Sequence, residues 1–250
     1  MNAPPAEVPA TSGITTSGST TPGSGAMFDA IAKRYDLLNR LLSLGIDQRW
    51  RRLTVAALGA AGTGQVLDLA TGTADLAILI AEQSTAARVS GVDPSERMLE
   101  IGRTKIERLG LSGRITLSVG EAEHLPFADA SFDAATIAFG IRNVPNRLAG
   151  LRELARVTRP GGRIAILELS EPRKGLLGPL ARFHVHTVVP WLGSLLSGAK
   201  EYRYLQRSIA AFPPAAEFAK TMHEAGLDVL EVTPLTFGVA HLYVGSPRAR

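Results

Sequence analysis

The chain has 250 residues, of which 45% are hydrophobic, and a formal net charge of +4 at pH 7. This length and apolar content suit one large domain with a buried core, and they exclude a chain that is disordered throughout. Its basic residues are scattered, so nucleic acid is not an expected partner. Because it has no cysteine, a disulfide, a zinc–cysteine site and a thiol nucleophile are excluded, and no metal is expected.

The two ends of the chain differ in composition from its middle. Residues 1–26 are rich in Ala, Pro, Ser, Thr and Gly, which predicts a disordered tail, and residues 246–250 are expected to fray. No apolar run approaches the roughly 20 residues that span a bilayer, and no signal peptide pattern opens the chain. We therefore expect a cytoplasmic protein with a single domain at residues 27–245.

Hydrophobic periodicity predicts the elements in chain order. Helical spacing over 28–58 predicts two helices that are interrupted near Gly45, and short apolar segments then alternate with amphipathic ones. We expect strands at 65–70, 88–93, 115–119, 132–139 and 163–169, and helices at 75–83, 96–109 and 147–157. This alternation predicts a Rossmann-like α/β fold whose sheet is mostly parallel and doubly wound.

Residues 172–214 break this alternation. They are apolar and aromatic, and we expect a helical insertion there, before a helix at 215–225 and two strands at 229–235 and 240–244. Basic residues flank the apolar ones, a combination that favours contact with anionic lipid, so a peripheral membrane protein is one prediction. A lid packed on the sheet and a homodimer interface are the alternatives.

The turn after the first strand carries the strongest local signal. Gly72 lies there between Asp68 and Asp75, and small residues at the carboxyl end of a parallel strand let a ligand approach the backbone. The turn lacks the three glycines of a dinucleotide fingerprint. Its carboxylates would repel a pyrophosphate but attract an ammonium and a sulfonium centre, which favours S-adenosylmethionine over NAD. The alternative is that Asp68 only caps the turn.

Two further strand ends carry matching signals. Asp93 ends the second strand, where a carboxylate accepts hydrogen bonds from ribose hydroxyls, although Asp93-Pro94-Ser95 could instead cap the next helix. After the third strand, the first residues of 120–127 are expected to lie along the edge of the adenine. Residues 125–127 are expected to form the wall of its pocket. Three such signals on successive strand ends predict a methyltransferase that uses S-adenosylmethionine.

From Met27 to about Gly245, the chain resembles the C-methyltransferases of ubiquinone and menaquinone biosynthesis, above all the demethylmenaquinone type. The resemblance implies cofactor contacts at Thr73, Asp93, Glu121 and Ala122, and at Ala138, where the family commonly has Ser. It rests on five stretches: 27–39, with Arg34-Tyr35-Asp36; 45–52; 139–144, with Phe-Gly-Ile-Arg-Asn-Val; 159–163; and 197–205.

This resemblance implies methylation of a ring carbon of a polyprenylated quinol, most directly demethylmenaquinol to menaquinol. A base or a cation would favour the phenolate, which is the better nucleophile. Arg142 and Asn143 follow the fourth strand and are the first candidates, and Tyr35 could close over the same point. Alternatively, Arg142 pairs with an acid such as Asp75 and only shapes the site, and Tyr35 is a core aromatic.

Three other functions stay open at this point. The acceptor could be the benzoquinol of ubiquinone biosynthesis, or another small or lipid molecule such as a phospholipid amine. The chain could also bind the cofactor without catalysing a reaction.

Overall fold

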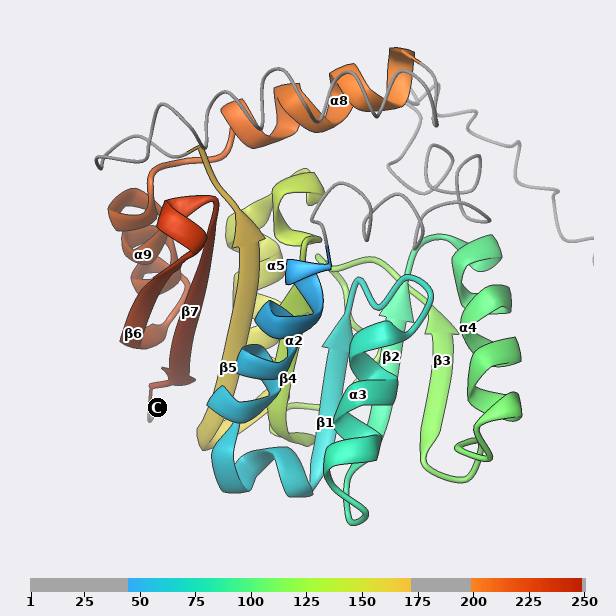
Figure 1. The fold of residues 1–250 in the computed structure, drawn as a ribbon. Coiled ribbons are helices and arrows are strands. Elements are labelled where there is room, and N and C mark those ends of the chain that lie inside the picture. The colour runs from blue at the N-terminus through green and yellow to red at the C-terminus, as the bar shows by residue number, and fades with distance from the viewer. Residues whose placement is uncertain (1–44, 172–198, 249–250) are drawn as a thin grey trace, which may run out of the picture.

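The structure is a computed structural model that describes residues 45–171 and 199–248 (Figure 1). These residues build a seven-stranded sheet in the order β3-β2-β1-β4-β5-β7-β6. Strands β1 to β5 run parallel, and β7 lies antiparallel to both β5 and β6. The strands are β1 (Gln65–Leu69), β2 (Arg88–Asp93), β3 (Ile115–Val119), β4 (Phe132–Ala138), β5 (Thr158–Leu169), β6 (Leu227–Leu235) and β7 (Ala240–Pro247).

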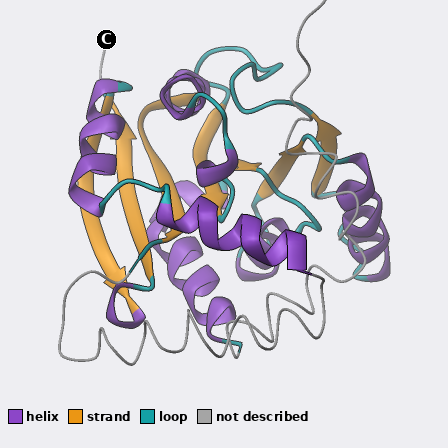
Figure 2. Ribbon diagram, turned by 90° about the horizontal axis from the view of Figure 1, so that it is seen from above, coloured by secondary structure: helices purple, strands orange, loops and turns teal. Residues whose placement is uncertain are grey.

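Helices cover both faces of this sheet and one of its edges. α2, α3 and α4 pack on one face, α5 and α9 pack on the other, and α8 crosses above the carboxyl ends of the parallel strands (Figures 1 and 2). The predicted Rossmann-like fold is confirmed. The helices are α2 (Ile46–Ala57), α3 (Asp75–Gln83), α4 (Glu96–Arg108), α5 (Arg147–Val157), α8 (Ala199–Ala210) and α9 (Ala215–Glu224), with short 3₁₀ turns η1 (Gly59–Thr63), η2 (Ile141–Asn143) and η4 (Thr236–Gly238).

The central strands are buried on both faces, which explains their almost continuous apolar sequence. On β1, Val66 packs in the layer of α2 and α3, whereas Leu67 and Leu69 pack in the layer of α5 and α9. Each central strand therefore contributes to two cores. The carboxyl ends of the strands are not covered by the helices of these two layers.

The predicted start of the fifth strand is wrong. We expected the glycines after α5 to form a turn before a strand at residue 163, but β5 begins at Thr158, directly after the helix. Gly161 adopts the left-handed conformation with φ of 76°, and a Cβ on Gly162 would lie 2.6 Å from the Asp133 carbonyl oxygen. The glycines therefore form an irregular strand start beside β4, where the register shifts between Phe132 and Ala134.

The C-terminal elements occur in the predicted order, but β6 begins at Leu227 and β7 extends to Pro247. Ser246 and Pro247, which were expected to fray, pair with Asp228 and Leu227 instead. α8 confirms the helical prediction for 199–210, and residues 172–198 lie outside the described residues, as do the first predicted helix and the N-terminal tail. Across 45–171 and 199–248, no helix has the length and the apolar content that crossing a membrane requires.

Candidate cofactor and acceptor site

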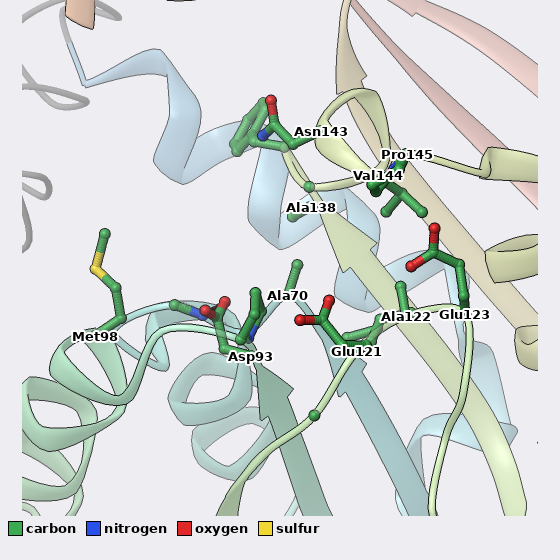
Figure 3. Close-up of a pocket in the computed structure, with 16 residues that line it drawn as sticks. Ala70, Asp93, Met98, Glu121, Ala122, Glu123, Ala138, Asn143, Val144 and Pro145 are labelled. Carbon is green, nitrogen blue, oxygen red and sulfur yellow. Dashed lines mark hydrogen bonds between the residues drawn. The ribbon is translucent and has the colours of Figure 1, made fainter. Parts of the chain in front are cut away.

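A cleft opens at the carboxyl ends of β1, β2 and β4 (Figure 3). Its position is the one where open α/β sheets bind ligands. The lining residues are Leu69, Ala70, Gly72, Asp93, Pro94, Met98, Gly120, Glu121, Ala122, Glu123, Ala138, Phe139, Gly140, Asn143, Val144 and Pro145.

The turn after β1 is bent tightly enough to bring its backbone to the cleft. Ala70, Gly72 and Ala74 all have positive φ, between 53° and 64°, a region that costs a residue with a side chain about 1–2 kcal/mol. Of these residues, Ala70 and Gly72 line the cleft. The strained turn therefore presents main chain rather than side chains to a ligand.

Asp68 lies beneath this turn and is not a lining residue. Its carboxylate accepts hydrogen bonds from Thr71 Oγ1 at 2.6 Å and from Thr136 Oγ1 at 2.8 Å, so it ties the turn to β4. Burial raises the pKa of Asp68 to about 6, although both hydroxyls oppose the rise. The geometry matches the turn-capping alternative for Asp68, and any influence on a ligand passes through the turn.

Asp93 joins the first two strand ends. One carboxylate oxygen accepts from the backbone N–H of Gly72, the other from that of Ser95, each at 2.9 Å. Ser95 in turn caps α4 by accepting from the backbone N–H of Met98. The two functions we considered for this strand end are compatible, because Asp93 orders the start of the helix and also lines the cleft.

Glu121, Ala122 and Ala138 line the cleft as the prediction placed them, whereas Thr73 does not. Thr73 is buried beside the turn and accepts a hydrogen bond from Lys105 Nζ at 2.9 Å.

The residues that were expected to pack against the adenine do not line the cleft. None of residues 125–127 is among the lining residues, and the Phe127 ring packs edge-on against Phe132 with centroids 4.9 Å apart. Pro94 and Met98 do line the cleft, and the sequence analysis missed both. Their signal was position, since Pro94 follows Asp93 directly and Met98 lies in the first turn of the helix that begins at Glu96.

The charge of the lining is one-sided. Asp93, Glu121 and Glu123 contribute carboxylates, and none of the sixteen lining residues in the described parts of the chain is Lys or Arg (Figure 3). Such a lining attracts a ligand that carries ammonium or sulfonium charge and repels a pyrophosphate. The residues present therefore fit S-adenosylmethionine better than a dinucleotide.

Arg142 lies behind the cleft in a buried ion pair. Its Nη1 donates to Glu168 Oε1 and to the Phe139 carbonyl, both at 2.6 Å, while Glu168 Oε2 accepts from the Arg142 backbone N–H. The Arg142 side chain is only 6% exposed and that of Glu168 is not exposed at all. Arg142 does pair with an acid, but Asp75, the acid we named, is the wrong one.

Asp75 pairs with another cation. Its carboxylate accepts from Lys105 Nζ at 2.7 Å, on the far side of the β1 turn from Arg142. Glu168 escaped the sequence analysis because it stands in the apolar run of β5. A carboxylate within an apolar strand was the available signal of a buried ion pair, since a buried charge needs a partner.

Asn143 lines the cleft one residue after Arg142. Its Oδ1 accepts a hydrogen bond from the hydroxyl of Tyr204, on α8, at 3.1 Å. Tyr35, the third predicted catalytic residue, lies outside the described residues. Of the predicted catalytic residues, the structure therefore places Asn143 in the cleft and Arg142 behind it.

Phe139 connects the cleft to α2. It has a φ of 58°, its ring lies 6.3 Å from that of Trp50, and the Arg51 guanidinium lies 5.3 Å from the ring centroid. Trp50 Nε1 also donates to Thr236 Oγ1 at 3.0 Å. The motif at 45–52 therefore supports the end of β4 from the side opposite the cleft.

Comparison with known proteins agrees with this geometry. The model of the ubiE/COQ5 methyltransferase family matches residues 16–246. The ubiquinone/menaquinone biosynthesis C-methyltransferase UbiE of Geobacter sp. (strain M21) is 48% identical over 222 residues, which cover 88% of this chain and 94% of that protein. The demethylmenaquinone methyltransferase of Thermus thermophilus is 47% identical over 220 residues, covering 88% and 99%.

Solved structures show the same fold at lower identity. A SAM-dependent methyltransferase from Aquifex aeolicus has a TM-score of 0.61 at 19% identity, over 87% of this chain and 97% of that one. The [4+2]-cyclase SpnF has a TM-score of 0.70 at 17% identity, over 94% and 100%. The predicted fold, resemblance and enzyme class are thus confirmed, and the chain belongs to the ubiE/COQ5 methyltransferase family.

Proposed function

We propose that this methyltransferase uses S-adenosylmethionine to methylate a ring carbon of a polyprenylated quinol, most directly converting demethylmenaquinol to menaquinol. The names of its Geobacter and Thermus relatives, a ubiquinone/menaquinone biosynthesis C-methyltransferase and a demethylmenaquinone methyltransferase, support this substrate class. When bound, the donor supplies an electrophilic methyl group. A new carbon–carbon bond replaces its carbon–sulfur bond, and the acceptor ring releases one proton. The benzoquinol step of ubiquinone biosynthesis is the alternative within the same chemistry.

The observation that carries the donor assignment is the carboxylate lining of the cleft. Asp93 accepts hydrogen bonds from the ribose hydroxyls, and Glu121 with Ala122 borders the adenine. Gly72 and Ala138 leave room for close approach, because neither has a side chain larger than a methyl group. Each of these residues lines the cleft in the described structure.

The acceptor belongs on the side of the cleft formed by the end of β4 and by η2. Asn143 contacts the acceptor there, because its side chain lines the cleft. Arg142 acts through the turn that it supports, since Glu168 and the Phe139 carbonyl engage its guanidinium. Tyr35, which the sequence analysis predicts to act at the same point, lies outside the described residues.

Turnover of a short-chain demethylmenaquinol tests the proposal. We expect release of S-adenosylhomocysteine together with the methylated quinol, and no release with a phospholipid amine. S-adenosylmethionine or S-adenosylhomocysteine should also raise the melting temperature, because a ligand that binds only the folded state stabilises it. Equal stabilisation by NAD would contradict the donor assignment.

The alternative function is a protein that binds the cofactor without catalysing a reaction. The fold is shared with a protein whose structure is described as a [4+2]-cyclase, so the fold alone does not require methyl transfer. A binding protein without activity would be stabilised by S-adenosylmethionine but would release no S-adenosylhomocysteine with demethylmenaquinol, its benzoquinol counterpart or a phospholipid amine.

A prenylated acceptor stays in the bilayer, so we also propose that residues 172–214 contact an anionic membrane. Their sequence supports this, because Arg173 and Lys174 precede the apolar Leu176, Leu177 and Leu180. Co-sedimentation with anionic liposomes at low salt should be lost when the three leucines are changed to Ser. If the wild type does not sediment, the segment is a lid, or a homodimer interface that sedimentation velocity would reveal.

A further inference from the structure

Among the side chains that the structure describes, one hydrogen bond links α8 to the cleft. The hydroxyl of Tyr204 donates to Asn143 Oδ1 at 3.1 Å and links residues 61 positions apart. Tyr204 is 37% exposed, so its ring lies at the surface and its hydroxyl is not required to satisfy a buried group. The bond therefore calls for an explanation other than the stability of the core.

The chemistry of an amide gives this bond a consequence. A carboxamide has one oxygen, which accepts hydrogen bonds, and one NH₂ group, which donates them. Because the oxygen of Asn143 accepts from Tyr204, its NH₂ group is left to donate to a group in the cleft, which Asn143 lines (Figure 3). Without the hydroxyl, the amide could rotate and present its oxygen to the cleft instead.

The backbone of Asn143 is fixed independently of Tyr204. Its N–H donates to the Gly140 carbonyl at 3.0 Å, and Glu168 accepts from the preceding backbone N–H at 3.1 Å. Only the side-chain torsions of Asn143 remain to be set. The loss of the Tyr204 hydroxyl should therefore change the orientation of the amide without unfolding the turn.

We propose that Tyr204 is a positioning residue that orients the Asn143 amide, so that Nδ2 donates a hydrogen bond to the oxygen beside the acceptor carbon. This inference rests on the proposed function and names the group that recognises the acceptor. A donor at that oxygen stabilises the phenolate over the phenol. The chain thereby selects acceptors that carry an oxygen next to the carbon that is methylated.

The test is a double-mutant cycle between Tyr204→Phe and Asn143→Ala. Tyr204→Phe should lower kcat/KM for demethylmenaquinol about 3- to 10-fold, as expected for one neutral hydrogen bond, with the Kd of S-adenosylmethionine unchanged. In the Asn143→Ala background, the same substitution should have no further effect. Equal effects in both backgrounds would show that Tyr204 does not act through Asn143.

A pH profile separates orientation from a general structural defect. If the amide stabilises the phenolate, Tyr204→Phe should shift the acidic limb of the kcat profile to higher pH. A variant that is merely less stable would lose activity at all pH values alike. An unchanged limb, together with unchanged kcat/KM, would overturn the proposal.

Binding of 1,4-naphthoquinone in the presence of S-adenosylhomocysteine, measured by calorimetry, distinguishes this inference from the proposed function. The quinone oxygen should accept from Asn143, so Tyr204→Phe should weaken binding only when Asn143 is present. If the wild type binds the quinone but does not methylate demethylmenaquinol, the proposed reaction is refuted and the positioning role is left intact. Equal quinone affinity in wild type and Tyr204→Phe would refute the positioning role itself.

Discussion

The two sides of the cleft are built by different means. On the β1–β2 side, the Asp93 carboxylate accepts from the backbone N–H groups of Gly72 and Ser95. On the β4–β5 side, bonds of Arg142 that involve the main chain are joined by two bonds between side chains: Arg142 to Glu168, and Tyr204 to Asn143. The first arrangement depends mainly on the course of the main chain, and the second depends on the identity of each partner.

This difference fits the two ligands that we propose. A donor shared by many enzymes can be recognised by a strand end and a turn, which vary little when surface residues change. The acceptor differs between enzymes, so its side is formed by replaceable side chains. The SpnF structure shares the fold at 17% identity, which agrees with a scaffold that tolerates changes of chemistry.

The largest effect should come from breaking the buried ion pair on the acceptor side. Arg142→Met leaves Glu168 charged and unpaired in a buried position, which should cost about 3–5 kcal/mol of unfolding free energy. Replacing both residues, with Glu168→Leu added, should restore most of that loss in urea denaturation. Cofactor affinity of the double variant should stay near the wild-type value while turnover stays low.

The opposite result would remove this contrast between the two sides. If the double variant regains full turnover, the pair only stabilises the protein and contributes nothing to the reaction. If the restored fold has lost its cofactor affinity, the acceptor side also supports the donor side.

Asp68 joins the two sides, and its titration should be visible in stability. A carboxyl whose pKa is about 6 when folded and near 4 when unfolded takes up a proton on folding between these values. Its contribution to stability is full below pH 4 and is lost as the pH rises through 6, by about 3 kcal/mol. Asp68→Asn should lack this component, so its stability relative to wild type should increase from pH 4 to pH 7. Parallel curves for the two proteins would contradict the raised pKa.

On the donor side, Asp93→Ala should weaken S-adenosylmethionine binding 10-fold or more, as expected for a charge-assisted bond worth about 1.5–3 kcal/mol. Asp228→Ala is the matched control, because Asp228 is exposed and pairs with Arg248 away from the cleft. Calorimetry measures both affinities. Equal binding by Asp93→Ala and wild type would exclude Asp93 from the cofactor site.

The smallest effect concerns the helix cap beneath Asp93. Ser95→Ala removes the acceptor for the Met98 backbone N–H and should cost about 1 kcal/mol of stability. Because Met98 lines the cleft, cofactor affinity should fall a few-fold, less than for Asp93→Ala. A larger loss than that of Asp93→Ala would mean that the cap, and not the carboxylate, shapes the donor side.

The elements bounded by clear local signals were predictable from sequence. β2, β3, α3 and α5 match the predicted ranges, because each is a short periodic run between turn residues. β5 was placed too late because Pro160, Gly161 and Gly162 are typical of a turn. Here they form the start of a strand, which depends on the neighbouring β4 and so on tertiary structure.

The site was predictable where it follows from the ends of strands. Gly72, Asp93 and Glu121 are found in the cleft because the carboxyl ends of parallel strands converge. Glu168 and Tyr204 could not be found in this way. Their partners lie 26 and 61 positions away in sequence, and local periodicity says nothing about which distant side chains meet.

The packing of Trp50 provides the protein with an optical reporter. The chain has two tryptophans, and the other, Trp191, lies outside the described residues. Trp50 is 5% exposed, and its indole contacts Phe139, which lines the cleft. After Trp191→Phe, fluorescence comes from a single indole beside the reaction site, so ligand binding can be followed in real time without a label.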